Sequence, residues 1–163
     1  MIILVGGLPG SGKTTFAKAL AESCKAVQIS SDSVRIQIGK QGQYSHTAKQ
    51  VVYEAMLKQT DAPLARGKNV VVDSTFYRES IRRLFTQKAL GRSIPFRMIF
   101  IDAAPEIIKT PLSKKRAESE ADYAVYEKIR EKYEPIRQPY LSLRSDKLSP
   151  EEMLRIATAY INS

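Results

Sequence analysis

A glycine-rich segment near the start of the sequence carries its clearest chemical signature. The segment has the spacing glycine, four residues, glycine, lysine and threonine, and it comprises Gly7, Leu8, Pro9, Gly10, Ser11, Gly12, Lys13 and Thr14. Glycines at these positions let successive backbone N–H groups point at phosphate oxygens, and a helix that begins here presents its positive end to them. Lys13 can reach the β- and γ-phosphates of ATP, while the Thr14 hydroxyl can bind Mg²⁺. We therefore expect this loop, together with the adjacent Thr15, to bind ATP and Mg²⁺.

A carboxylate and a guanidinium three residues apart could serve a second reactant. Asp32 and Arg35 follow a short apolar run that is typical of a strand. A carboxylate at this place could take the proton of an attacking hydroxyl, and Arg35 would lie on the same side of a helical turn, where it could bind an anionic group. Asp32 could equally be a helix cap, because Asp is favoured at that position.

Two further carboxylates end strand-like runs. Asp73 follows the run Val70-Val71-Val72 and precedes Ser74 and Thr75, whereas Asp102 follows an apolar run over 96–101. Either carboxylate could orient Mg²⁺-bound water, and Asp102 could also cap the next helix. We expect Asp73 and Thr75, with Arg35, to contact the second reactant.

The elements that must position these residues alternate between strands and helices. Apolar runs predict strands over 2–5, 26–29, 69–73, 96–101 and 140–143, and helical spacing predicts helices over 14–22, 47–57, 79–89, 121–133 and 150–161. This alternation predicts a three-layer α/β fold with a mostly parallel sheet and helices on both faces. In such a sheet ligands bind at the carboxyl ends of the strands, where the candidate residues lie.

Composition limits the other possibilities. The 163 residues suit a single domain, which we expect over 1–163, and the formal charge of +9 favours an anionic partner or a solvated basic face. The one cysteine and one histidine, Cys24 and His46, exclude an internal disulfide and a Cys/His zinc cluster. No apolar run reaches membrane length, so we expect a soluble cytoplasmic protein without a membrane partner. His46 could line the site or lie in a surface loop.

A basic run follows the third expected strand. Between positions 76 and 97 only Glu79 is acidic, whereas six residues are basic: Arg78, Arg82, Arg83, Lys88, Arg92 and Arg97. Such a run could follow a nucleic-acid backbone, or it could be the solvated face of a helix. Phe76 and Tyr77 beside it could stack on a base or belong to the core.

Taken in order, these motifs resemble the phage-type polynucleotide kinase domain and the wider group of small AAA-type P-loop kinases. The resemblance covers about residues 1–137. It rests on the phosphate loop, Asp32-x-x-Arg35, the run from Val70 to Thr75 and a basic segment in the 110s. It implies a P-loop kinase fold with ATP and Mg²⁺ as cofactors. It also implies that Asp32 is the general base and that Arg35 contacts a phosphate of the acceptor.

The same resemblance implies a lid near 109–122 whose arginines contact ATP. Arg116 matches the second lid arginine, but Leu112 stands at the position of the first. A further departure is Phe76, which occupies a place where the family often has Asn.

The function implied is an ATP-dependent kinase that uses Lys13, Asp32 and Arg116 to phosphorylate the 5′-hydroxyl end of a nucleic acid. One alternative is a kinase for a small-molecule hydroxyl, such as that of a sugar acid, nucleoside or antibiotic. A second is a nucleotide-binding module without transferase activity. The oligomeric state does not follow from the sequence.

Overall fold

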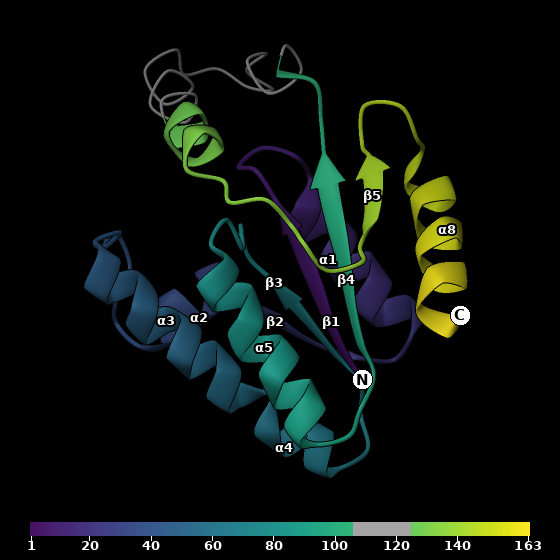
Figure 1. Ribbon diagram of the computed structural model, residues 1–163, viewed down its shortest axis with the longest axis horizontal. Helices are drawn as coiled ribbons and strands as arrows, with labels where there is room; N and C mark the ends of the chain where they lie inside the picture. The colour runs from purple at the N-terminus through teal and green to yellow at the C-terminus, as the bar shows by residue number, and fades with distance from the viewer. Residues whose placement is uncertain (106–124) are drawn as a thin grey trace.

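A computed structural model describes residues 1–105 and 125–163 of the chain. Five strands and six helices have defined bounds in this part (Figure 1). The strands are β1 (Ile2–Gly7), β2 (Val27–Ser30), β3 (Val70–Asp73), β4 (Phe96–Asp102) and β5 (Leu141–Arg144). The helices are α1 (Lys13–Ser23), α2 (Ser31–Gln37), α3 (His46–Gln59), α4 (Asp61–Ala65), α5 (Glu79–Gly91) and α8 (Pro150–Asn162). Residues 125–131 are also helical, within the predicted helix 121–133.

The strands form one parallel sheet in the order β2-β3-β1-β4-β5. Because all strands run the same way, their carboxyl ends meet at one edge, which brings the phosphate loop, α2 and the segment after β3 together. β1 lies in the centre, paired with β3 through Val5 and Asp73 and with β4 through Gly7 and Ile101. The predicted α/β fold is therefore confirmed.

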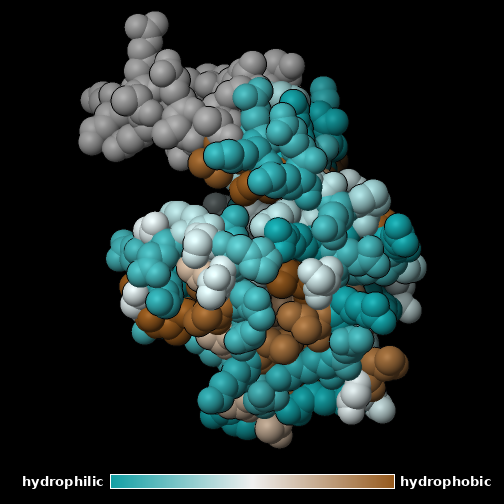
Figure 2. Space-filling model, turned by 60° about the vertical axis from the view of Figure 1, so that its left-hand side comes forward, coloured by the Kyte–Doolittle hydropathy of each residue, from teal (hydrophilic) through white to brown (hydrophobic). Residues whose placement is uncertain are grey.

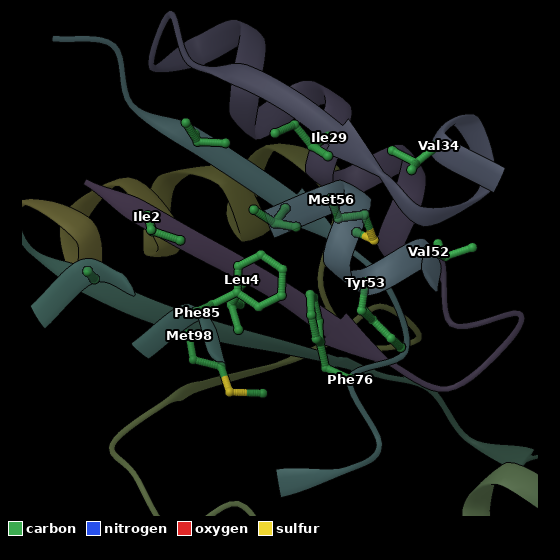
Figure 3. Packing of buried hydrophobic residues seen from close by; sticks show 13 residues of the cluster. Ile2, Leu4, Ile29, Val34, Val52, Tyr53, Met56, Phe76, Phe85 and Met98 are labelled. Atoms are coloured by element: carbon green, nitrogen blue, oxygen red, sulfur yellow. The ribbon is translucent and has the colours of Figure 1, made fainter. Parts of the chain in front are cut away.

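Alternating side chains of the strands fill two cores, one on each face of the sheet. Ile2 and Leu4 point into a core with residues of α3 and α5, such as Met56 and Phe85 (Figure 3). Ile3 and Val5 point the other way, into a core that includes residues of α1 and α8. This arrangement follows from the two-residue period of a strand, which places successive side chains on opposite faces. Figure 1 shows the resulting layers, with α3 and α5 on one side of the sheet and α8 on the other.

Local signals set the bounds of several helices. Ser149 caps α8 with a complete capping box: its hydroxyl accepts the N–H of Glu152, and the Glu152 carboxylate accepts the N–H of Ser149. Ser45 caps α3 by accepting the N–H of Ala48 at 3.2 Å. In the described ranges 1–105 and 125–163, no helix has both the length and the apolar content that crossing a membrane requires.

Candidate active site

The phosphate loop joins the buried strand β1 to helix α1. Gly7 has a φ of +154°, and a Cβ atom there would collide with the carbonyl oxygen of Ile101 on the neighbouring strand β4. Gly12, directly before α1, has a left-handed φ of 83°. Position 7 therefore requires glycine and position 12 favours it, in agreement with the sequence pattern. Helix α1 begins at Lys13, so its positive end faces the space over the loop.

Ser145, which directly follows β5, contacts this loop. The Ser145 hydroxyl lies 2.8 Å from the carbonyl oxygen of Ser11 and 3.1 Å from that of Asp102. The Asp102 carboxylate accepts the N–H of its neighbour Ala103 at 2.9 Å, and it does not line the large cavity described below. The cap of a following helix, the other role considered for Asp102, falls on residues 106–124, outside the described part of the chain.

Asp73 lies beneath the loop rather than on the cavity wall. Its side chain is 1% exposed, and burial raises the pKa of this carboxyl group, against the opposing effects of the Thr14 hydroxyl and the charge of Lys13. One of its oxygens, Oδ1, has no hydrogen-bond partner within the described part of the chain. A buried carboxylate oxygen and a threonine hydroxyl are the hard oxygen donors that suit Mg²⁺. The residues at this place therefore fit the metal, which Thr14 and Asp73 would hold directly or through its water.

Asp32 and Arg35 lie on α2, a seven-residue helix that the sequence analysis considered only as a possible turn. The N-cap of α2 is Ser30, so Asp32 is in the first turn and is not the capping residue. Asp32 is exposed to the cavity, and Arg35, one turn later, also lines it although its side chain is only 7% exposed. The expected juxtaposition of these two side chains is present.

One large cavity connects the two groups of residues. It has a volume of about 750 Å³ and reaches from Lys13 and Thr14 at the loop, past Asp32, to α3 and the segment after β3. Side chains predicted for the site that line it are Pro9, Lys13, Thr14, Asp32, Arg35 and Thr75. Other lining residues had no predicted role in the site: Tyr44, Lys49, Tyr53, Lys128 and Lys132. Ser74 lines the cavity beside Thr75, and so do Tyr77 and Arg78, for which the sequence left a ligand contact open. His46 is thus on the cavity wall, at the first turn of α3.

The segment after β3 alternates between cavity and core. Thr75 and Tyr77 line the cavity, whereas Phe76 between them is fully buried and packs against Tyr53 and Phe85 at ring-centre distances of 5.9 and 5.6 Å. Phe76 has a φ of +47°, a conformation that Asn adopts more readily than other non-glycine residues. The position therefore serves the backbone turn and the core, and Phe76 cannot stack on a ligand.

The basic run after β3 does not form one surface. Arg82 is fully buried, and Arg97 on β4 donates to the carbonyl of Tyr160 on α8. Lys88 and Arg92 both pair with Asp61, at 2.8 and 2.6 Å. Arg82 therefore cannot contact a nucleic-acid backbone, whereas for the exposed residues of the run that contact stays a prediction.

The predicted lid near 109–122, including Arg116 and Leu112, lies within 106–124 and so outside the described residues. The segment that follows it returns to the site. The Tyr133 hydroxyl donates to the carbonyl of Thr75 at 3.0 Å, and the N–H of Glu134 donates to the carbonyl of Tyr77 at 2.8 Å.

Comparison with solved structures places the whole chain in a known fold. An APS kinase from Mycobacterium tuberculosis, in complex with AMPPNP and APS, is 18% identical with a TM-score of 0.72, covering 99% of this chain and 97% of that one. A gluconokinase from Sinorhizobium meliloti 1021 is 19% identical with a TM-score of 0.71, covering 98% and 90%. The fold is thus that of the small P-loop kinases.

Comparison of the sequence with known proteins gives two matches, one to a curated protein over part of the chain and one to a family over most of it. An uncharacterized protein of Mycobacterium tuberculosis is 33% identical over an 87-residue alignment that covers 46% of this chain. The match spans only 18% of the length of that relative. The sequence pattern of the AAA domain family matches residues 2–136, which contain the phosphate loop, Asp32, Arg35 and Asp73. The chain therefore belongs to this family of AAA-domain proteins.

Proposed function

We propose that this protein is an ATP-dependent kinase that transfers the γ-phosphoryl group to a hydroxyl of a small molecule, and that its 163 residues act as one domain. The observation that carries the proposal is the single cavity in which Lys13 and Thr14 lie at one end and the exposed carboxylate of Asp32 stands between them and α3. A nucleotide on the loop and an acceptor on the α3 side would meet at Asp32.

The nucleotide would lie over the loop formed by residues 7–14, with Thr15 in the first turn of α1. Backbone N–H groups of the loop and the positive end of α1 would bind the phosphate oxygens, and Lys13 would contact the β- and γ-phosphates. Thr14 would bind Mg²⁺, and Asp73 would hold its water. When bound, the metal offsets the negative charge of the phosphates.

The acceptor hydroxyl would be oriented by the opposite wall. Asp32 takes the hydroxyl proton as the new O–P bond forms, and the bond from the γ-phosphorus to the β-bridging oxygen breaks, which leaves ADP. The chain supplies little covalent chemistry, so positioning and charge account for the rate. Arg116 remains a proposed contact to the ATP phosphates, on the basis of the family resemblance.

A small molecule is favoured over the nucleic-acid end for two reasons. Of the basic run that a polynucleotide could follow, Arg82 is buried, and Lys88, Arg92 and Arg97 have partners within the fold. The structural neighbours named above are a gluconokinase and an APS kinase in complex with APS.

The test is a labelled-ATP transfer assay across small hydroxyl compounds and 5′-hydroxyl oligonucleotides. We expect transfer to a small compound, and Asp32→Asn should lower turnover by about 10²–10⁴ with little change in ATP affinity. Glu131→Gln is the matched control, since Glu131 is exposed and does not line the cavity. Transfer to oligonucleotides alone would restore the polynucleotide hypothesis. ATP binding without transfer to any compound would indicate a nucleotide-binding module.

A further inference from the structure

A second hollow adjoins the large cavity, between α3 and α5. Its volume is about 360 Å³, and five residues line both hollows: His46, Lys49, Tyr53, Tyr77 and Arg78. We refer to these five residues as the junction. Because the two hollows share the junction, a molecule held beside Asp32 can extend past it into the hollow between the helices.

Most of the surface that lines this second hollow is apolar, although six of its eleven lining residues are polar or charged. Leu57 of α3 and Ile81 and Leu84 of α5 line it together with the two junction tyrosines. Its one carboxylate, Glu54, accepts a hydrogen bond from Gln50 at 3.0 Å. Figure 2, in which the side of the molecule that carries α3 is turned forward, shows apolar side chains exposed among hydrophilic ones. The hollow therefore suits an apolar group rather than a hydrated one.

The junction itself is cationic. The Lys49 ammonium and the Arg78 guanidinium lie 5.2 and 5.6 Å from the ring centre of Tyr77, and Arg78 also contacts His46 Nε2. Neither cation has a carboxylate partner within the described part of the chain. Two cations without carboxylate partners beside one aromatic ring are suited to an anionic group.

A third cation lies deeper on the same wall. Arg35 is 7% exposed and lines the cavity, and its guanidinium stacks 4.7 Å from the ring centre of Tyr44. One of its nitrogens donates to the carbonyl of Gln43, but its Nε is buried without a partner among the described residues. The Arg35 guanidinium thus adds a third positive charge to the wall that faces the acceptor.

The nucleotide does not account for these charges. Its phosphates would lie over residues 7–14, where Lys13, the loop N–H groups and Mg²⁺ meet them. Arg35, Lys49 and Arg78 belong to α2, α3 and the segment before α5, on the acceptor side of Asp32. The only carboxylate that lines the large cavity among the described residues is Asp32 itself. The excess of positive charge thus belongs to the acceptor.

We propose that the acceptor is an acid with an apolar body: its hydroxyl faces Asp32, its carboxylate or phosphate binds Lys49 and Arg78, and its apolar body lies between α3 and α5. This proposal rests on the proposed kinase function and adds the chemical class of the acceptor. It differs from a small polar acid, which would leave the second hollow empty, and from a neutral alcohol, which would leave the junction cations unpaired.

A binding experiment tests the junction without requiring activity. The probe is 1-anilinonaphthalene-8-sulfonate, an anion on an apolar body, and N-phenyl-1-naphthylamine is its neutral counterpart. Fluorescence titrations are made with saturating ADP, so that the nucleotide loop is occupied. We expect the anionic probe to bind more tightly than the neutral one, and Lys49→Gln or Arg78→Gln to weaken it about tenfold, the effect of losing one charge-assisted hydrogen bond.

Two further variants define the location of the probe. Leu84→Glu puts a negative charge into the second hollow and should weaken the anionic probe, whereas Arg83→Gln is the matched control, since Arg83 is exposed on α5 and lines neither hollow. Circular dichroism verifies that each variant is folded. Equal binding of the probe to Lys49→Gln, Arg78→Gln and Arg83→Gln, or equal binding of both probes to the wild type, would overturn the proposal.

The acceptor class is then tested by transfer from labelled ATP to matched compounds. The set comprises 3-phenyllactate, 2-hydroxy-3-phenylpropyl phosphate, the neutral 3-phenylpropane-1,2-diol and glycolate. We expect kcat/KM to be higher for one aromatic acid than for the neutral diol and glycolate, and the two acids distinguish a carboxylate from a phosphate. A preference for glycolate, for the diol or for an oligonucleotide would overturn the proposal. Probe binding at the junction without transfer to any compound would contradict the kinase function alone.

Discussion

Replacing Arg82 should destabilise the whole fold, although the side chain belongs to a run that looks like a surface patch in the sequence. Arg82 is 0% exposed, and its guanidinium donates to three backbone carbonyls, those of Phe76 at 2.8 Å, Glu134 at 3.1 Å and Pro135 at 2.7 Å. Arg82 therefore connects the turn after β3 with the segment at Glu134 and Pro135.

The magnitude follows from what Arg82→Met would leave behind. Methionine keeps most of the aliphatic volume but removes all three donors, so three carbonyls near the core lose a charged partner. Each such bond contributes roughly 1.5–3 kcal/mol, but the three share one group and are not additive. Part of the loss is offset because a buried charge is also removed, so we expect a decrease of about 3–5 kcal/mol in the free energy of unfolding. That is a large fraction of the free energy of unfolding of a typical domain, which is roughly 5–15 kcal/mol.

Urea denaturation followed by circular dichroism measures this difference. Arg83→Met is the matched control, because the neighbouring side chain is exposed, and its effect should stay within about 0.5 kcal/mol. Arg82→Lys should be intermediate, since a single ammonium cannot reach all three carbonyls. An Arg82→Met variant within about 1 kcal/mol of the wild type would refute the reasoning.

Three further perturbations follow from the site and the helix ends. Lys13→Ala should lower kcat by at least about 10² in the transfer assay while the melting temperature stays unchanged, and near-normal turnover would contradict the role of the loop. Asp73→Asn should weaken Mg-ATP binding about tenfold in calorimetry. Because burial raises the pKa of Asp73, the folded state holds its proton more tightly than the unfolded one, and wild-type stability declines as pH rises through that raised pKa. The Asn variant should therefore be more stable than the wild type at neutral pH, with the difference shrinking in acid, and a less stable variant at neutral pH would show that the hydrogen bonds of the carboxylate outweigh its burial. Ser149→Ala should lower the free energy of unfolding by about 1 kcal/mol in urea denaturation, because α8 loses its N-cap. An unchanged free energy of unfolding would mean that the first turn of α8 is already frayed in the wild type.

The parts of the fold that depend on local pattern could be predicted from the sequence. Apolar runs identified all five strands to within about two residues, and the loop from Gly7 to Thr14 needed only its spacing. The short helix α2 was less visible, since seven residues give little periodicity, yet the three-residue spacing of Asp32 and Arg35 already placed them on one side.

The features that depend on packing could not be predicted in this way. Nothing in the run from Arg78 to Arg97 distinguishes the buried Arg82 from the exposed Arg83, because their difference arises when the segment at Glu134 and Pro135 docks on α5. The sequence likewise did not indicate that Lys49 belongs to the site, because the pattern of its helix predicts only which residues face the core. Only the pairing of α3 with the segment after β3 brings it beside Tyr77.

The Ser145 hydroxyl links the phosphate loop to strand β5, so nucleotide binding should affect the stability of that strand. Ser145 follows β5 directly and holds the carbonyls of Ser11 and Asp102, and the N–H of Ser145 also donates to Asp102 at 2.9 Å. A nucleotide that orders the loop would thus also slow the local opening of β5 at the far edge of the sheet. Amide protons of Leu141–Arg144 should exchange more slowly with deuterium in the presence of ADP, so protection mapped by hydrogen exchange will extend beyond the phosphate loop itself.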